Sequence, residues 1–335
     1  MRKSWRSTVV FAVVAALLIF GAILAMRGAR PARASNATQG SHAPGVTQAA
    51  TSSDDRNPGV VPFQHVLVVM EENQNYSSVI GSSSMPYLNS LADTYAYSNG
   101  YFANTHPSIG NYFMITTGQI ITNDDNFGGT VDQDNIVRHL IAAGLTWKEY
   151  SESLPYQGYD GGNNGEYAQR HDPLSYFSDV RNSPTQQQNL VPFTQFATDL
   201  ANNALPNYSF IVPNLIDDGH DCPPGNPNCP NSTLLADIDA WLQTNIAPLV
   251  ENKNFQTPGN GLLIITFDES GNDNNHGGGQ VAWVAVGPNV KKAYTSTTFY
   301  QHPNTLQLMC TSIGLNACPF MAVAQRNMQE FVQPN

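Results

Sequence analysis

Five short runs of β-branched and aromatic residues alternate with helical segments along this chain, and this alternation limits its possible folds more than any other feature. The runs are HVLVVM (65–70), LTWKEY (145–150), YSFIVP (208–213), LLIITF (262–267) and VAWVAV (281–286). Short apolar runs of this kind predict buried strands. Strands that alternate with helices form parallel sheets that helices cover on both faces. We therefore expect an α/β fold with a mostly parallel central sheet and helices on both faces.

The segments between these runs carry helical patterns with recognisable ends. The predicted helices span 108–117, 135–143, 193–204 and 233–250. Gly118 and Gly144 follow the first two helices, where glycine is common, and Asn231 or Ser232 is expected to cap the last one.

Residues 151–191 interrupt the alternation with a sequence rich in Tyr, Gly and Asn. A loop of this length predicts an ordered insertion that caps a functional site. The chain has 335 residues, of which 41% are hydrophobic, and this suffices for one large domain. We therefore expect a single catalytic domain over 63–335, with 151–191 as a cap insertion.

The first 62 residues have the composition of a targeting segment and a linker. A basic start and an uncharged apolar run over 8–26 precede PARAS, in which Ala32 and Ala34 are spaced as at a signal-peptidase site. Residues 1–34 are thus predicted to be a signal peptide or, since 19 apolar residues nearly span a bilayer, an uncleaved signal anchor. Residues 35–62 are small, polar and rich in Pro and Gly, which predicts a flexible linker. The protein is then extracellular, periplasmic or anchored at the outer side of a membrane, which it contacts only through an uncleaved N-terminal segment.

The chain without residues 1–34 is strongly acidic. The whole chain has 15 basic and 26 acidic residues; residues 1–34 hold six of the basic and none of the acidic ones, so nine minus 26 leaves a formal charge of −17. This charge excludes general nucleic-acid binding. It also repels anionic substrates, so a site for phosphate in this chain requires a local positive charge such as a bound cation.

The four cysteines are predicted to form two disulfides. Proximity in the sequence pairs Cys222 with Cys229 and Cys310 with Cys318, and export permits disulfide formation. Three pairings are possible in principle. A zinc site built from all four cysteines is the alternative, but CPPGNPNC lacks the short spacing of a zinc knuckle.

Three of the predicted strands end in acidic residues. HVLVVM is followed by Glu71, Glu72 and Asn73, YSFIVP by NLIDDGHDC, and LLIITF by Asp268 and Glu269. Ligands in open α/β sheets bind beyond the carboxyl ends of the strands, so we expect these three turns to converge. Converging carboxylates repel one another unless a cation lies among them. Each turn alone is better explained as a solvated loop or a helix cap; the three together predict a site for zinc, manganese, magnesium or calcium.

The segment FANTHPSIGNYFMITTGQ supplies a candidate nucleophile. Thr105 stands just before a predicted helix whose first turn contains Pro107, where free N–H groups attract a phosphate oxygen. A hydroxyl in this position can bind the metal, lose its proton and attack phosphorus, whereas an N-cap is its structural alternative. Ser108 is the rival nucleophile because HPSIG resembles a nucleophile elbow, but His106 replaces the first glycine of that motif. The acidic stretch NDDNF (123–127) has no evident partner and is expected to be structural.

Six segments of the chain resemble the phosphoesterase family that contains acid phosphatases and bacterial phospholipases C, within the alkaline phosphatase superfamily. They are VLVVMEENQNYSSVIG, NTHPSIGNYFMITTG, HDPLSYFSDV, FIVPNLIDDGHDC, ITFDESGNDNNHGGG and YQHPNTLQLMCTSIGL, in that order from about residue 64 to 315. The resemblance implies an alkaline-phosphatase-like fold and metal-dependent hydrolysis of phosphoesters.

The resemblance also implies roles for individual residues. The implied metal ligands are Glu72, Asn73, Thr105, Asp268 and Glu269. Thr105 is the implied nucleophile, with a phosphothreonine intermediate. Asp218 and His220 match the segment in which related enzymes place an acid and a histidine near the phosphate, for a second metal or for proton transfer to the leaving group. Further candidates for the pocket are Ser108, Asn111, His171, Asp221, His276 and His302.

The sequence thus predicts an exported, metal-dependent phosphomonoesterase of the acid-phosphatase type that acts on a phosphorylated small molecule. A phospholipase C or phosphodiesterase that acts on phospholipid at the same site is the first alternative, although ENQNYSSVIG and THPSIGNY depart from the phospholipase C pattern. The second alternative is a non-catalytic surface protein that binds a phosphorylated partner through its metal.

Overall fold

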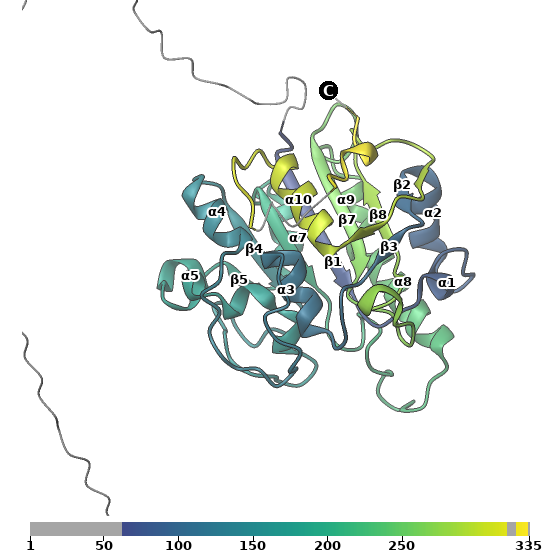
Figure 1. Cartoon of the computed structure of the whole chain (residues 1–335), viewed down its shortest axis with the longest axis horizontal. Coiled ribbons are helices and arrows are strands. Elements are labelled where there is room, and N and C mark those ends of the chain that lie inside the picture. The colour runs from purple at the N-terminus through teal and green to yellow at the C-terminus, as the bar shows by residue number, and fades with distance from the viewer. Residues whose placement is uncertain (1–61, 320–325, 334–335) are drawn as a thin grey trace, which may run out of the picture. The chain divides into compact units, whose positions relative to one another are not determined.

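The structure of the chain is a computed structural model that describes residues 62–319 and 326–333 (Figure 1). The predicted signal peptide or anchor, and the linker up to residue 61, lie outside the described residues. Within the described ranges, no helix has both the length and the apolar composition that crossing a membrane requires.

A central sheet of eight strands, in the order β5-β4-β6-β1-β7-β8-β2-β9, organises the described chain. Its strands are β1 His65–Glu71, β2 Ala96–Ser98, β4 Trp147–Ser151, β5 Leu190–Pro192, β6 Tyr208–Val212, β7 Gly261–Phe267, β8 Trp283–Val286 and β9 Tyr294–Ser296. A separate parallel pair is formed by β3 Tyr101–Phe102 and β10 Tyr300–Gln301. Neighbouring strands of the large sheet are parallel, except that β8 runs antiparallel to both β7 and β2. The predicted α/β fold with a mostly parallel sheet is confirmed.

Strand β1 lies between β6 and β7 and pairs with both in parallel, so that Val68 stands opposite Phe210 and Ile264. All three side chains are fully buried, as continuous apolar runs in a covered parallel sheet should be. Strand β8 reverses direction because no α-helix lies between Phe267 and Trp283, and a parallel return would need such a crossover.

Ten α-helices and four short 3₁₀ segments are present in the described ranges. The helices are α1 Tyr76–Val79, α2 Pro86–Thr94, α3 Ile109–Thr117, α4 Ile136–Ala142, α5 Ser178–Arg181, α6 Pro184–Gln187, α7 Thr194–Ala201, α8 Asn231–Asn245, α9 Ala247–Val250 and α10 His302–Ser312. The 3₁₀ segments are Gln169–His171, Pro173–Tyr176, Asn275–Gly277 and Gln329–Phe331. Helix α3 packs against α10 and α2 against α8; Figure 1 shows α3 and α10 in front of the central strands.

The predicted helix ends are only partly correct. Gly118 follows α3 in the left-handed conformation (φ +74°), and the Asn135 side chain accepts the Arg138 N–H at 3.0 Å at the start of α4. The predicted helix over 233–250 is divided into α8 and α9, since Pro248 lacks the N–H that a continuous helix needs. The predicted cap is wrong, because α8 already includes Asn231 and follows Pro230.

Residues 151–191 are ordered, as predicted for an insertion. They contain the first two 3₁₀ segments, helices α5 and α6, and strand β5, which pairs with β4 at the edge of the sheet. Their function as a cap stays a prediction. The structure also contains the disulfides Cys222–Cys229 and Cys310–Cys318, so the alternative four-cysteine zinc site is not formed.

Candidate active site

The turns that follow β1, β6 and β7 lie together at one edge of the sheet. The Glu72 N–H donates to the Asp218 carbonyl oxygen at 3.0 Å, and the Asp268 N–H donates to the Glu71 carbonyl oxygen at 2.9 Å. The carboxylates of Glu72, Asp218 and Asp268 are all fully buried. The order of the strands therefore brings together acidic residues that are far apart in the sequence.

The carboxylate of Glu72 lies at the centre of this cluster. Its Oε2 accepts hydrogen bonds from Asn73 Nδ2 at 2.8 Å and from Ser108 Oγ at 3.0 Å. Its Oε1 accepts one from the Tyr112 hydroxyl at 2.7 Å and lies 3.2 Å from His171 Nε2. Ser108 is thereby committed to Glu72, which separates it from the role of nucleophile.

Asn73 joins the first and third turns. It takes the left-handed conformation (φ +54°), which asparagine tolerates better than most residues, and its N–H donates to Asp268 Oδ1 at 3.0 Å. Because its Nδ2 donates to Glu72, its side-chain oxygen is the atom that it can offer to a cation.

The imidazole of His171 lies between two buried carboxylates. Its Nε2 is 3.2 Å from Glu72 Oε1, and its Nδ1 is 3.2 Å from Asp218 Oδ2. In the described part of the chain, His171 Nε2, Asp218 Oδ2 and Asp268 Oδ2 are buried and make no hydrogen bond of acceptable geometry. Glu72, His171 and Asp218 each offer one ligand atom within 4.8 Å of the others.

These buried and unpartnered atoms fit a divalent cation. Leaving polar atoms buried without a partner is costly, and a cation held by Glu72, His171 and Asp218 would give a partner to the atoms that face it. Carboxylate oxygens combined with an imidazole nitrogen suit zinc or manganese, while additional oxygens from neighbouring turns suit magnesium or calcium.

The ionisation of the cluster depends strongly on such a cation. Burial raises the pKa of Glu72 well above its usual range, and the charges of Asp268 and Asp218 raise it further. Burial also raises the pKa of Asp218, raises that of Asp268 to about 6, and lowers that of His171 well below its usual range. Without a cation, burial thus favours the neutral forms; a cation would favour ionised carboxylates.

The hydroxyl of Thr105 is held by its neighbours. Its Oγ1 accepts a hydrogen bond from Asn123 Nδ2 at 2.9 Å and donates to the His106 carbonyl oxygen at 3.1 Å. Asn111 fixes the backbone on both sides, since its Oδ1 accepts the Thr105 N–H at 3.2 Å and its Nδ2 donates to the Thr105 carbonyl at 2.9 Å. The same Nδ2 lies 3.3 Å from Glu269 Oε2, which links the hydroxyl-bearing segment to the turn after β7.

Glu269 has a strongly raised pKa in this position. Burial raises the pKa to about 9, with further contributions from the charges of Asp268 and Asp125. His106 Nδ1 lies 3.1 Å from Glu269 Oε1, and His106 Nε2 lies 3.1 Å from the Asp273 carbonyl oxygen. A carbonyl only accepts, so Nε2 carries a proton, and Nδ1 faces the Glu269 carboxyl group.

The start of α3 differs from the prediction. The helix begins at Ile109, so Pro107 precedes it instead of lying in its first turn, and the N-cap is Ser108. The Ile109 N–H donates to Asp125 Oδ1 at 3.3 Å, and the Gly110 N–H donates to the Pro107 carbonyl at 3.4 Å. The predicted anion site made of free N–H groups at this terminus is therefore wrong.

Three side chains of the site were not predicted from the sequence: Tyr112, Asn123 and Arg170. The stretch NDDNF, expected to be structural, contacts the Thr105 hydroxyl through Asn123. Arg170 Nη2 lies 3.0 Å from His220 Nε2, and Arg170 Nε lies 3.9 Å from Asp125 Oδ2. The only available signals were that Arg170 precedes His171 and that NDDNF closely follows the Thr105 segment.

The remaining predicted histidines have different surroundings. His220 Nδ1 lies 2.7 Å from Asp221 Oδ1, and its backbone N–H donates to Asp218 Oδ1 at 2.8 Å. His302 is buried and contacts the Asp268 carbonyl through Nε2 at 2.7 Å; burial lowers its pKa to about 4. This contact fixes the backbone of the turn after β7.

His276 lies among aromatic rings instead of carboxylates. Its ring centroid is 4.5 Å from that of Phe102 and 4.6 Å from that of Phe299. No contact described for its ring joins it to the acidic cluster in residues 62–319 and 326–333.

The glycines that follow Asp273 allow a close approach to the Thr105 segment. The Gly278 N–H donates to the Ala103 carbonyl at 3.2 Å, and the Ala103 N–H donates to the Gly279 carbonyl at 2.9 Å. A Cβ atom on Gly278 would stand 2.5 Å from the Thr105 carbonyl oxygen, well inside contact distance. Glycine is thus required where this loop packs against the candidate nucleophile.

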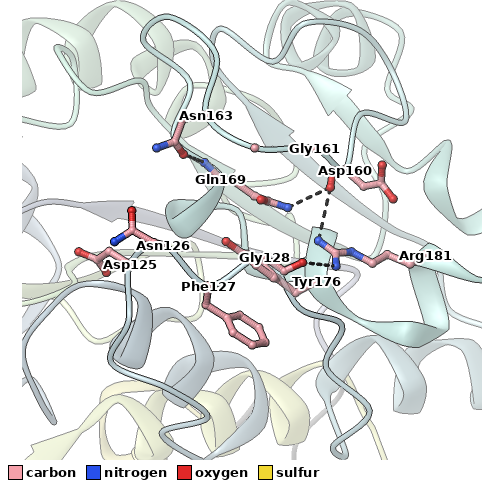
Figure 2. A pocket seen from close by; sticks show the side chains of 11 residues that line it. Asp125, Asn126, Phe127, Gly128, Asp160, Gly161, Asn163, Gln169, Tyr176 and Arg181 are labelled. Carbon is pink, nitrogen blue, oxygen red and sulfur yellow. Dashed lines mark hydrogen bonds between the residues drawn. The ribbon is translucent and has the colours of Figure 1, made fainter. Parts of the chain in front are cut away.

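A polar cavity of about 430 Å³ adjoins the site (Figure 2). It is lined by residues 125–127 of the NDDNF segment, by Gly128, and by residues 160–163, Gln169, Tyr176 and Arg181 of the insertion. Asp125 belongs to this lining and also contacts Ile109 and Arg170, so it borders both the cavity and the site.

The chain is similar in sequence to known phosphoesterases. The model of the Phosphoesterase family matches residues 82–316, a range that includes Thr105 and Asp268 and begins after Glu72. A probable acid phosphatase of Kluyveromyces lactis is 31% identical over 73% of this chain and 56% of its own length. A phosphatidylinositol-3-phosphatase of Mycobacterium tuberculosis is 33% identical over 76% of this chain and 78% of its own length. A phospholipase C B of the same species is 28% identical over 67% of this chain and 42% of its own length.

The chain thus spans only about half the length of several curated relatives that it matches. Among solved structures, a protein of the alkaline phosphatase superfamily from Vibrio parahaemolyticus has a TM-score of 0.53 at 9% identity and covers 77% of this chain and 68% of its own. A lipoteichoic acid synthase from Listeria monocytogenes has a TM-score of 0.51 at 10% identity and covers 76% of this chain and 72% of its own. At this level of identity the likeness concerns the fold.

Proposed function

This chain belongs to the phosphoesterase family, and we propose that it hydrolyses phosphoric monoesters in a metal-dependent reaction with Thr105 as the nucleophile. The observation that carries the proposal is the buried set of unpartnered carboxylate and imidazole atoms beside an oriented threonine hydroxyl. The acid phosphatases among its relatives support the reaction class.

The proposed metal ligands are those implied by the family resemblance together with two residues that the geometry adds. The first set is Glu72, Asn73, Thr105, Asp268 and Glu269; the second is His171 and Asp218. A divalent cation bound there would offset the carboxylate charges and polarise the phosphoryl oxygen. This set has enough donors for one cation or two, and zinc, manganese, magnesium and calcium are all candidates.

The side chains around Thr105 prepare it for attack. Asn123 and the His106 carbonyl fix the direction of the Oγ1 lone pairs and proton, and Asn111 fixes the backbone. In the proposed first step a bond forms between Oγ1 and phosphorus while the bond to the leaving alcohol breaks, which gives a phosphothreonine. Water then hydrolyses this intermediate and regenerates the hydroxyl.

Arg170 is proposed to hold the phosphoryl oxygens. A guanidinium group binds phosphate through paired N–H donors. Arg170 supplies such a group next to His220. In the structure, His220 Nε2 accepts from Arg170 while Asp221 holds Nδ1, so His220 orients the guanidinium. Because Nε2 carries no proton while it accepts from Arg170, His220 could act as the acid for the leaving group only after Arg170 has turned toward the phosphate and Nε2 has taken up a proton from water.

We propose that the protein is exported. Its two disulfides are consistent with an oxidising compartment, and the N-terminal composition supports a targeting segment.

The test compares wild-type protein with Thr105→Ala after loading with each metal in turn, with 4-nitrophenyl phosphate as substrate. We expect Thr105→Ala to lose at least about 10³-fold in kcat and the wild type to yield a phosphorylated peptide containing Thr105 after acid quench. Ser108→Ala should retain far more activity, because the Ser108 hydroxyl donates to Glu72. Equal rates for Thr105→Ala and wild type would show that Thr105 is not the nucleophile.

Phosphodiester hydrolysis is the second candidate because of the phospholipase C relative. The cavity beside the site is lined by polar side chains, which favours monoesters of polar alcohols over lipids. Faster hydrolysis of bis(4-nitrophenyl) phosphate or of a phosphocholine lipid than of 4-nitrophenyl phosphate would contradict the preference for monoesters. Phosphate binding without turnover of any ester would instead indicate a metal-dependent binding protein.

A further inference from the structure

We propose that the cavity in Figure 2 binds the alcohol part of the substrate, and that this alcohol is a neutral polyol such as a sugar or a cyclitol. The inference rests on the proposed function, because it assigns a leaving-group subsite to the same active site. It adds a substrate class, which the family resemblance does not supply.

The cavity is joined to the reaction centre through two contacts of Asp125 and through the position of Gln169 in the sequence. Asp125 lines the cavity, and its Oδ1 accepts the N–H of Ile109, the residue next to Ser108. Its Oδ2 lies 3.9 Å from Arg170 Nε, the proposed phosphate-binding group. Gln169 lines the cavity one residue before Arg170 and two before His171. An alcohol esterified to a phosphate at Arg170 would therefore extend into the cavity.

The lining of the cavity offers hydrogen-bonding groups of both kinds. Its side-chain amides belong to Asn126, Asn163 and Gln169, and its carboxylates belong to Asp125 and Asp160. Amide groups both donate and accept, and carboxylates accept from hydroxyls. A ligand that carries several hydroxyl groups matches this lining, whereas an alkyl chain would leave the polar groups without partners.

The guanidinium of Arg181 in the lining is held by backbone carbonyls. Its Nη1 donates to the carbonyl oxygens of Gly128 and Gly129 at 3.3 and 2.7 Å, and its Nε donates to the Ser175 carbonyl at 2.7 Å. Figure 2 shows a further contact, of Nη2 with the Asp160 carbonyl, and Nη1 also lies 3.3 Å from Thr130 Oγ1. The lining holds two carboxylates, Asp125 and Asp160, against the one guanidinium of Arg181, so its excess of negative charge disfavours a second phosphate and favours a neutral alcohol.

The loop of the insertion is fixed in place before a ligand binds. The Gln169 N–H donates to Asn163 Oδ1 at 2.9 Å, and Gln169 Nε2 donates to the Asp160 carbonyl at 2.9 Å. The Tyr176 ring stacks on Phe127 with centroids 5.7 Å apart, which joins the insertion to the NDDNF segment. A subsite that is already ordered binds its ligand with less loss of conformational entropy.

The experiment compares two substrates that share a six-membered ring and a primary ester but differ in hydroxyl groups: glucose 6-phosphate and cyclohexylmethyl phosphate. With metal-loaded, full-length wild-type protein, we expect kcat/KM to be at least about tenfold higher for glucose 6-phosphate, as two or more hydrogen bonds would supply. Asn126→Ala should lower this ratio about fivefold for each hydrogen bond lost, because cyclohexylmethyl phosphate has no ring hydroxyl for the amide to bind. Asn189→Ala, in a separate cavity beside β4, is the matched control and should leave the ratio unchanged.

The outcomes separate the inference from the proposed function. Hydrolysis of 4-nitrophenyl phosphate with equal or higher kcat/KM for cyclohexylmethyl phosphate would overturn the polyol subsite alone. A preference for glucose 6-phosphate that Asn126→Ala and Asp160→Ala both leave intact would place the hydroxyl groups elsewhere and would also overturn it. No hydrolysis of any of the three esters with any metal would overturn both. Thermal unfolding of each variant identifies a loss of rate that is caused by misfolding.

Discussion

Gly110 offers a test that separates the position of Thr105 from the stability of the fold. It lies in the first turn of α3, beside Thr105 and Asn123. A Cβ atom on Gly110 would overlap Asn123 Oδ1 and would stand 2.6 Å from Thr105 Cγ2. Carbon atoms in contact are about 3.5–4.0 Å apart, so the Thr105 side chain would have to move by about 1 Å.

Gly110→Ala should affect the free energy of unfolding much less than it affects the rate of hydrolysis. Alanine is more favourable than glycine inside a helix by about 0.5–1 kcal/mol, which offsets part of an overpacking cost of about 1–3 kcal/mol. The net loss in the free energy of unfolding should therefore be no more than about 2 kcal/mol. A displacement of about 1 Å at a reacting group, in contrast, costs on the order of 100-fold in rate.

Steady-state hydrolysis of 4-nitrophenyl phosphate and urea unfolding measure the two quantities on the same preparation. Asn123→Ala is the control, because it removes the hydrogen bond to Thr105 without crowding the threonine, and it should cost only about tenfold. Unchanged kcat/KM in a folded Gly110→Ala protein would refute the assignment of Thr105, since the hydroxyl could then move without consequence.

Three further predictions concern the metal and the loop after β7. In metal-free protein the pKa of Glu269 is raised from 4.5 to about 9, so the folded state binds a proton more tightly than the unfolded state. The unfolding temperature of the metal-free protein should therefore fall as the pH rises from 4.5 to about 9, and saturating zinc should remove most of this fall. An unfolding temperature that does not change with pH in EDTA would contradict the raised pKa. His171→Gln should weaken zinc binding at least about tenfold in titration calorimetry, and unchanged affinity would remove His171 from the ligand set. Gly278→Ala should lower the free energy of unfolding by about 1–3 kcal/mol in urea, whereas an unchanged value would mean that the loop can move away from Thr105.

The central strands and the position of the acidic turns could be predicted because they depend on local composition. The runs at 65–70, 208–213 and 262–267 are apolar throughout, and such runs are stable only where both faces of a sheet are covered. Parallel strands have their carboxyl ends at one edge, so the acidic residues that follow them must meet there. The direction of β8 depended instead on the absence of a crossover helix.

The site residues that were not predicted belong to no apolar run and follow no strand end. Tyr112 is one of several aromatic residues with helical spacing, and only the packing of α3 places its hydroxyl 2.7 Å from Glu72. Asn123 lies in an irregular segment and Arg170 in a three-residue 3₁₀ segment, and in neither does strand or α-helix periodicity indicate the direction of a side chain. The predicted phosphate site at the start of α3 failed for a related reason, because Asp125 from a later loop occupies the N–H group of Ile109.

The sequence by itself determined the α/β class and the edge of the sheet at which carboxylates gather. These follow from hydrophobic periodicity and from residue types next to strand ends, which are local properties of the chain. The tertiary structure alone decided that His171 lies between Glu72 and Asp218, that Asn123 and Asn111 hold Thr105, and that a polar cavity adjoins the site. The residues in these contacts are separated along the chain and meet only when it folds. Their hydrogen bonds depend on distances of about 3 Å, which no pattern in the sequence encodes.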